Sequence, residues 1–183
     1  MSIESVMREI EIESSSGKKF LPIVGPVKGN FLYMLAKVSQ AKTVLDVGTL
    51  TGYSALLMTK AVGTKGKVTT IENDKNYYDE AVRNFKKAKA KNIIPKFGDA
   101  TELLKKMPEN KFDIIFLDIW KEGYVQVLDN CVRVLKKNGL LIADNVMWEE
   151  EPLKKWREAI FNHKKIVSFL VPLADGMSVS MKS

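Results

Sequence analysis

Three oxygen-bearing side chains directly follow two apolar stretches of the chain and could bind a metal ion together. Asp118 follows the run 112–117, and Asp144 and Asn145 follow the run 140–143. Both runs are typical of buried strands, and the carboxyl ends of parallel strands meet at one edge of a sheet. Carboxylate and amide oxygens are ligands that Mg²⁺ accepts, with positions left for water and substrate. The pattern therefore favours a divalent metal site with Asp118, Asp144 and Asn145 as ligands.

Lys121 lies three residues after Asp118 and could act as a general base. A bound cation would make a hydroxyl group of a substrate easier to deprotonate. Lys121 could take that proton if the cation and burial lower the pKa of its amine. A simpler alternative stays open, in which Asp144 and Asn145 cap the next segment while Asp118 and Lys121 form a surface ion pair.

A glycine turn earlier in the chain is typical of a nucleotide-type cofactor site. Gly48 and Gly52 separate an apolar strand from a helix, and glycine lets a ligand approach the backbone closely. The helix would offer free N–H groups at its first turn, which contains Ser54. Leu50 stands where the dinucleotide pattern Gly-x-Gly-x-x-Gly has its middle glycine, so a pyrophosphate would lack its close approach.

Glu72 ends the next predicted strand, about where doubly wound folds place an acid that binds ribose. Together with the turn, this residue implies a cofactor that contains ribose and no pyrophosphate. S-adenosylmethionine fits, because its carboxylate can meet the glycine turn and Ser54 while Glu72 accepts hydrogen bonds from the ribose hydroxyls. The alternative is an ordinary strand, turn and helix with a solvated Glu72.

Strand and helix patterns alternate from Thr43 onward, which predicts an α/β fold: a doubly wound, mostly parallel, seven-stranded sheet of the Rossmann-like kind. The predicted strands are 43–47, 67–72, 93–97, 112–118, 139–143, 165–171 and 177–182. The predicted helices between them are 52–62, 74–90, 100–106, 122–137 and 150–162. Residues 172–176 are too few for a crossover connection, so the last strand must run antiparallel.

Two helices are predicted before the sheet, one at about 2–13 and one from Phe31 to about Gln40, with residues 22–28 extended or turning. These helices could cover the site. The apolar stripe of the first helix could serve as part of a lid or as a contact in a homodimer.

The composition is that of one globular domain. The chain has 183 residues, 45% of them hydrophobic and 28% charged, and we expect residues 1–40 to cover the site and residues 43–183 to form the sheet core. We expect a cytoplasmic protein, because the apolar runs are too short to cross a bilayer and the first residues do not resemble a secretory signal.

The cysteine and histidine content argues against several kinds of catalytic site. Cys131 is the only cysteine and lies in an apolar helical pattern, so we expect it in the core and expect no disulfide. His163 is the only histidine and stands beside Lys164 and Lys165, which favours a surface position. A Ser-His-Asp triad or a histidine-ligated metal would have to use this residue.

The chain carries a formal net charge of +7, spread over many lysine clusters. Such a charge attracts acidic partners, including nucleic acid. Most of these lysines lie on helical segments that also carry acids, and no aromatic-rich basic motif accompanies them. A solvated lysine surface is therefore the simpler interpretation, and nucleic-acid binding stays an alternative.

The chain resembles the class I S-adenosylmethionine-dependent methyltransferases and, within them, the cation-dependent catechol and caffeoyl-CoA O-methyltransferases. The similarity runs from about Pro22 to Met181. It rests on the blocks Val24-Gly25 with Lys28-Gly29, Gly48 with Gly52-Tyr53-Ser54, Thr70-Ile71-Glu72, Gly98-Asp99-Ala100, Leu117-Asp118-Ile119-Trp120-Lys121, Ala143-Asp144-Asn145-Val146 and Asp175-Gly176.

The resemblance implies a role for each matching residue. It implies metal ligation by Asp118, Asp144 and Asn145, and proton abstraction by Lys121. It implies contacts to the methionine part of the cofactor from Val24, Gly48 and Ser54, and to the ribose from Glu72. It implies contacts around the adenine from Asp99, Ala100 and Trp120. Asp118 is implied as a further cofactor-binding residue. From the residues alone, Trp120 could equally be a core aromatic.

Two departures from the family pattern concern the acceptor. Pro172, Leu173 and Ala174 stand where catechol enzymes carry a carboxylate that holds a second hydroxyl, so we expect that contact to be absent. Trp148 is followed by the acids 149–151 rather than by the glycine of caffeoyl-CoA enzymes, which argues against recognition of a CoA tail.

We therefore expect a metal-dependent O-methyltransferase that uses S-adenosylmethionine and Mg²⁺, or another divalent cation such as Ca²⁺ or Mn²⁺, on a small catechol-like or vicinal-hydroxyl acceptor. One alternative keeps the cofactor and takes a modified base of tRNA as the acceptor. A second alternative is a cofactor-binding regulatory domain without turnover, which the set Asp118, Lys121, Asp144 and Asn145 argues against.

Overall fold

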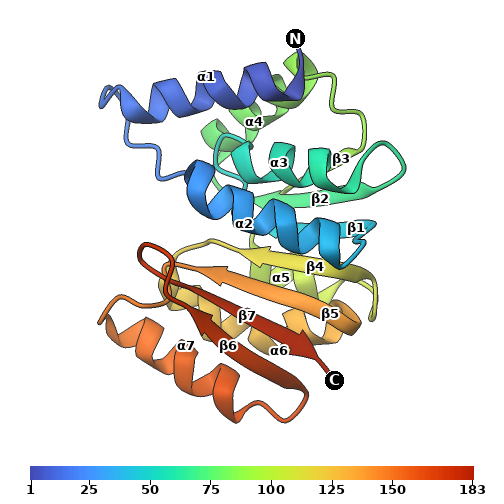
Figure 1. Cartoon of the computed structure of the whole chain (residues 1–183), viewed down its shortest axis with the longest axis vertical. Coiled ribbons are helices and arrows are strands. Elements are labelled where there is room, and N and C mark those ends of the chain that lie inside the picture. The colour runs from blue at the N-terminus through green and yellow to red at the C-terminus, as the bar shows by residue number, and fades with distance from the viewer. The chain divides into compact units, whose positions relative to one another are not determined.

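Strands and helices alternate along the chain in the computed structural model, which describes all 183 residues. The chain divides into two compact units, residues 1–98 and 99–183 (Figure 1). Each unit carries its own strands with helices packed beside them. No helix combines the length and the apolar character that a membrane-spanning segment needs.

The first unit is a parallel sheet with four helices. Its elements are α1 (Ile3–Ser15), α2 (Gly25–Val38), β1 (Thr43–Val47), α3 (Tyr53–Val62), β2 (Lys67–Glu72), α4 (Lys75–Lys87) and β3 (Ile93–Phe97). The strands lie in the order β3-β2-β1 and run parallel. Helices α1 and α2 both pack against α3, which is buried along nearly its whole length.

The second unit contains the four remaining strands. Its elements are α5 (Ala100–Lys105), β4 (Phe112–Leu117), the short 3₁₀ helix η1 (Lys121–Gly123), α6 (Tyr124–Val134), β5 (Leu135–Asp144), α7 (Glu151–Asn162), β6 (Ile166–Val171) and β7 (Met177–Lys182). The strand order is β4-β5-β7-β6, with β4 and β5 parallel. Strand β7 runs antiparallel to both of its neighbours, as the short connection before it predicted.

Two predicted boundaries differ most from the structure. Helix α2 begins at Gly25, within the segment expected to be extended, because Pro26 stands in its first turn, where proline's fixed φ favours helix. Residues up to 137 were expected to be helical, but β5 begins at Leu135, which pairs with Phe112. The apolar pattern of α6 continues into this strand, so periodicity alone does not mark the change.

The core of the second unit forms where α6 packs against β4 and α7. Phe112, Phe116, Tyr124 and Trp156 are its largest fully buried side chains. Cys131 is also fully buried, as predicted, and burial raises the pKa of its thiol to about 12. This thiol therefore stays protonated and unreactive at neutral pH.

Candidate active site

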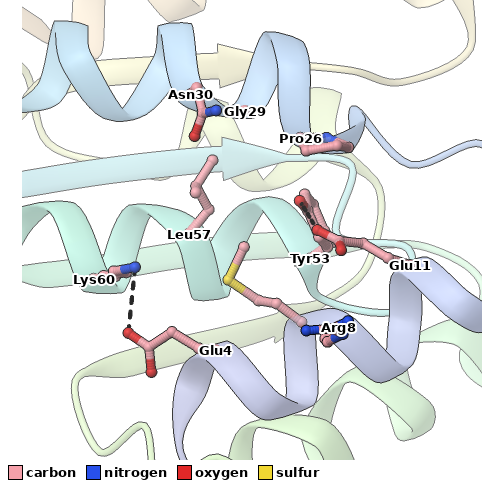
Figure 2. A pocket seen from close by; sticks show the side chains of 10 residues that line it. Glu4, Arg8, Glu11, Pro26, Gly29, Asn30, Tyr53, Leu57 and Lys60 are labelled. Atoms are coloured by element: carbon pink, nitrogen blue, oxygen red, sulfur yellow. Dashed lines mark hydrogen bonds and ion pairs between the residues drawn. The ribbon is translucent and has the colours of Figure 1, made fainter.

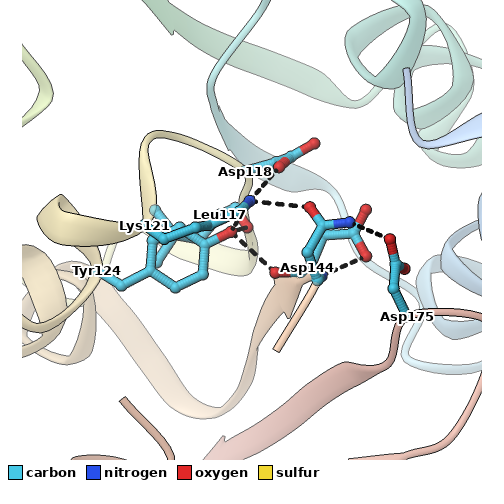
Figure 3. Close-up of polar contacts among 7 residues, drawn as sticks. Leu117, Asp118, Lys121, Tyr124, Asp144 and Asp175 are labelled. Carbon is cyan, nitrogen blue, oxygen red and sulfur yellow. Dashed lines mark hydrogen bonds and ion pairs between the residues drawn. The ribbon is translucent and has the colours of Figure 1, made fainter. Parts of the chain in front are cut away.

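The polar side chains predicted to form a metal site gather at the carboxyl ends of β4 and β5. Lys121 Nζ lies 2.9 Å from Asp118 Oδ1 and 2.9 Å from Asn145 Oδ1 (Figure 3). Asp144 is the last residue of β5 and accepts a hydrogen bond from the backbone N–H of Asn145 at 2.8 Å. The structure thus brings the three predicted ligands and the predicted base into one group within the second unit.

Asn145 is held in a fixed orientation by its neighbours. Its backbone lies in the left-handed region with φ of 57°, a conformation that asparagine tolerates better than most residues. Its Nδ2 donates to Asp175 Oδ2 at 2.5 Å, so its Oδ1 is the atom that faces Lys121. Asp175 therefore sets which end of the Asn145 amide points to the group.

Asp175 and Tyr124 are the residues of this group to which sequence reasoning assigned no role. Asp175 lies in the turn before β7, and its position beside Gly176 was the only signal for it. The Tyr124 hydroxyl lies 2.9 Å from Lys121 Nζ and gave no separate signal, because a tyrosine at the start of an apolar helix usually indicates core packing.

The group is partly shielded from solvent. The side chains of Lys121 and Asp118 are 14% and 20% exposed, and Asp144 is buried. An ion pair with this little exposure is screened less than a surface pair, so the alternative of a surface ion pair does not describe it. Shielding also strengthens the attraction of the carboxylates for a cation.

The chemistry of the donor set fits a hard cation. No three His, Cys, Asp or Glu side chains cluster closely enough to hold a metal ion, so a site here would combine two carboxylates with the amide oxygen of Asn145. Asp118 Oδ1 and Asn145 Oδ1 already lie around one atom, Lys121 Nζ. Such a partial oxygen set suits Mg²⁺, which keeps water and substrate oxygens in its remaining positions.

The glycine turn forms a tight loop in the first unit. Gly48, Leu50 and Gly52 all have positive φ, at 104°, 48° and 97°. The N–H groups of Gly48 and Thr49 both donate to Ile71 O at 3.0 Å, which ties the turn to the end of β2. Buried hydrogen bonds also stabilise the turn. The Thr49 hydroxyl lies 2.5 Å from the Thr70 hydroxyl, which donates to Asp46 Oδ2. No role was predicted for Asp46 from the sequence.

Glu72 joins the same turn through its carboxylate. Its Oε2 accepts from Leu50 N–H at 2.8 Å, and its Oε1 accepts from the N–H groups of Asn73 and Asp74, each at 2.9 Å. A carboxylate oxygen can accept two hydrogen bonds, so Oε2 keeps one position for a further donor such as a ribose hydroxyl. Ser54 comes two residues after Gly52 in the chain and lies in the buried first turn of α3.

Gly52 cannot be replaced without disturbing the turn. A Cβ at this position would lie 2.5 Å from a ring carbon of Phe85, and its φ of 97° disfavours any other residue. We expect Gly52→Ala to lower the free energy of unfolding by about 1–3 kcal/mol in urea denaturation. Gly63→Ala is the matched control, because Gly63 has φ of 70° but nothing within 4 Å of its Cβ position. Equal losses for the two variants would contradict the role of the Phe85 contact.

The other predicted cofactor residues lie at the starts of helices or at the surface. Val24 is the N-cap residue of α2. In the second unit, Asp99 caps α5 by accepting from Glu102 N–H at 3.2 Å, and Ala100 is the first residue of that helix. Trp120 is 82% exposed, which excludes a core position and leaves its face open to a ligand.

The family model described as O-methyltransferase matches residues 4–182. A catechol O-methyltransferase of Niastella koreensis is 34% identical over 128 residues, which are 68% of this chain and 58% of that protein. A caffeoyl-CoA O-methyltransferase of Populus kitakamiensis is 30% identical, with 86% of this chain and 76% of that protein covered.

Solved structures show the same fold. The O-methyltransferase of Bacillus cereus in complex with SAH superposes with a TM-score of 0.88 at 20% identity, covering 98% of this chain and 91% of that one. This agreement confirms the predicted Rossmann-like methyltransferase fold. The chain belongs to the O-methyltransferase family that includes the catechol and caffeoyl-CoA enzymes, and it is an S-adenosylmethionine-dependent methyltransferase of class I.

Proposed function

We propose that this enzyme transfers the methyl group of S-adenosylmethionine to a hydroxyl oxygen of a small catechol-like acceptor, with a divalent cation bound at the ends of β4 and β5. One observation carries the proposal: Lys121 Nζ lies 2.9 Å from both Asp118 Oδ1 and Asn145 Oδ1. A candidate base and two oxygen donors therefore meet at one point, as deprotonation of a cation-bound hydroxyl requires.

Asp118, Asp144 and Asn145 would hold the cation, with Mg²⁺ as the ion that this oxygen set suits. When bound, the cation would supply positive charge that favours the ionised form of the acceptor hydroxyl. Asp175 orients the Asn145 amide for this task through its hydrogen bond to Nδ2. The low exposure of Asp118 and Asp144 limits competition from water.

Lys121 would move the proton. As a neutral amine, its Nζ accepts the proton of the acceptor hydroxyl, and the oxygen left behind attacks the methyl carbon. The new bond joins oxygen to carbon as the bond between carbon and sulfur breaks, and the electron pair of that bond returns to sulfur. The products are the methyl ether, S-adenosylhomocysteine and a protonated Lys121.

Exposed apolar side chains close to the group suit an aromatic acceptor. Trp120 follows β4 and is 82% exposed, while Met147 and Trp148 follow β5 and are 41% and 42% exposed. Exposed apolar side chains that gather on one surface can mark a ligand-binding site. We infer that these three side chains contact the ring of the acceptor. Residues 172–174 contain no carboxylate, so a second hydroxyl of the acceptor would have no side-chain acceptor there.

In the first unit, Glu72 would bind the ribose through Oε2, while Gly48, Ser54 and Val24 would meet the methionine part at the N-termini of α3 and α2. The contacts of Asp99, Ala100 and Trp120 with the adenine stay predictions.

Replacing Glu72 with glutamine is expected to weaken cofactor binding. The glutamine amide has only one acceptor oxygen. Its NH₂ group would face either the N–H of Leu50 or the N–H groups of Asn73 and Asp74, and a donor cannot accept their hydrogen bonds. Hydrogen bonds to a charged group contribute about 1.5–3 kcal/mol, so the Kd for S-adenosylhomocysteine should rise about 10- to 100-fold in isothermal calorimetry. Glu80→Gln, which removes only the partner of Lys19, serves as the control. An unchanged Kd in folded Glu72→Gln would contradict the ribose contact.

The proposal is tested by incubating the purified protein with methyl-labelled S-adenosylmethionine, Mg²⁺ and a set of catechols, with bulk tRNA assayed in parallel. We expect label in a mono-O-methylated catechol. Label in tRNA with none in any catechol would overturn the acceptor class.

A further inference from the structure

The hydroxyl group of Tyr124 lies between the ends of two neighbouring strands in the second unit. It is 3.2 Å from Leu117 O at the end of β4 and 3.0 Å from Asp144 O at the end of β5 (Figure 3). Its third neighbour is Lys121 Nζ at 2.9 Å. The whole Tyr124 side chain is buried, so water does not replace these partners.

The directions of these hydrogen bonds follow from the donor count. A phenol has one proton, and backbone carbonyls can only accept, so the proton of Tyr124 is directed to Leu117 O and Asp144 O. Its oxygen is then left as an acceptor for an N–H of Lys121.

The ring of Tyr124 is held in place by packing. Trp156 meets it edge-on, with ring centroids 5.3 Å apart and planes at 73°. The indole N–H of Trp156 in turn donates to Ser178 Oγ at 3.1 Å, and both residues are buried. The position of the Tyr124 hydroxyl therefore depends on the core and on two backbone carbonyls, and on no side chain of the candidate metal site.

The other partners of Lys121 Nζ are Asp118 Oδ1 and Asn145 Oδ1, the same atoms that the proposed function directs to a cation. Oxygens that coordinate a cation are less available to a lysine, because their lone pairs face the ion. Tyr124 is the one partner that keeps its hydrogen bond to Lys121 in that state.

We propose that Tyr124 is a positioning residue that holds Lys121 Nζ at the ends of β4 and β5 while Asp118 and Asn145 bind the cation. This inference rests on the proposed function, in which Lys121 accepts the proton of the acceptor. A neutral amine has two N–H groups and one lone pair. Donation to Tyr124 uses one N–H and limits the lone pair that receives the proton to the two remaining positions around Nζ.

The kinetic test compares Tyr124→Phe, Lys121→Met and the double variant. A misplaced base lowers the chemical step, so we expect kcat of Tyr124→Phe to fall about 10- to 100-fold, with the KM of donor and acceptor changed by less than about 3-fold. In the Lys121→Met background, the same replacement should change the residual rate by less than about 2-fold, because the group that it positions is already gone. Equal effects in both backgrounds would overturn the proposal and assign Tyr124 a purely structural role.

Two further variants separate positioning from stability. Ser180→Ala removes another fully buried hydroxyl of the same unit, 2.8 Å from Ser168 Oγ, and should leave kcat unchanged. A p-aminophenylalanine at position 124 keeps a donor for the two carbonyls but is a poor acceptor, so it should lower kcat like Tyr124→Phe while retaining the fold. Wild-type kcat in this variant would contradict the acceptor role of the hydroxyl.

A spectroscopic measurement tests the contact without turnover. In protein labelled with ¹⁵N-lysine and loaded with Mg²⁺ and S-adenosylhomocysteine, at a pH low enough to keep Lys121 protonated, the Lys121 ammonium signal, identified by its loss in Lys121→Met, should be visible because hydrogen bonding slows its exchange. It should broaden beyond detection in Tyr124→Phe, and an unchanged signal would overturn the proposal. This result stands even if no catechol is methylated, so the failure of the positioning role and that of the proposed reaction are distinguishable.

Discussion

Replacing Lys121 with methionine is expected to lower kcat for methyl transfer by about 10²- to 10⁴-fold, the range that a general base contributes. Methionine retains much of the side-chain volume but has no nitrogen to accept the proton. The Kd for S-adenosylhomocysteine should change by less than about 2-fold, because the hydrogen-bond partners of the Lys121 amine are Asp118, Tyr124 and Asn145, all in the second unit. Initial rates with saturating donor and acceptor measure the effect.

Lys136→Met is the matched control for this variant. Lys136 is also half-buried and also paired with an aspartate of the second unit, since its Nζ lies 2.7 Å from Asp113 Oδ1. Its removal should cost stability without lowering kcat. If Lys121→Met kept more than about a tenth of the wild-type kcat while remaining folded, a general-base role for Lys121 would be refuted.

Replacing Asp118 with asparagine is expected to raise the Kd for Mg²⁺ at least about 10-fold, because even residues that only support a metal ligand change affinity by 10- to 100-fold. The replacement retains an oxygen of similar position but removes a negative charge from a partly buried site, where charge strongly affects cation binding. Calorimetric titration of Mg²⁺ into the protein with S-adenosylhomocysteine bound measures the change.

The control for this variant is Asp113→Asn, which removes a carboxylate from the same strand, β4, together with its ion pair to Lys136. That replacement should leave the Kd for Mg²⁺ unchanged. Equal Mg²⁺ affinities for wild type, Asp118→Asn and Asp113→Asn would place the cation elsewhere or exclude it.

Much of the fold could be predicted from the sequence because its strands are short, apolar and bounded by clear turn signals. The limits of β1, β2, β3 and β7 agree with the predicted ones. The start of β5 could not be predicted, because Leu135 continues the helical pattern of α6 and becomes a strand residue only by pairing with Phe112. Long-range pairing of this kind leaves no local pattern.

The candidate site was partly predictable for a similar reason. Asp118 follows β4, Asp144 ends β5 and Asn145 follows it, so topology alone places all three at one edge of the sheet. The roles inferred for Asp175 and Tyr124 depend on individual hydrogen bonds across the group, which spacing in the sequence does not indicate. The exposure of Trp120 likewise resolves an alternative that composition left open.

The most direct test of a cation held by Asp118, Asp144 and Asn145 is the initial rate of methyl transfer from S-adenosylmethionine to a catechol as a function of Mg²⁺ concentration, starting from protein freed of metal with EDTA. We predict a rate near background without the ion and a saturable increase as Mg²⁺ is added. A full rate in EDTA, unaffected by added Mg²⁺, would contradict the account.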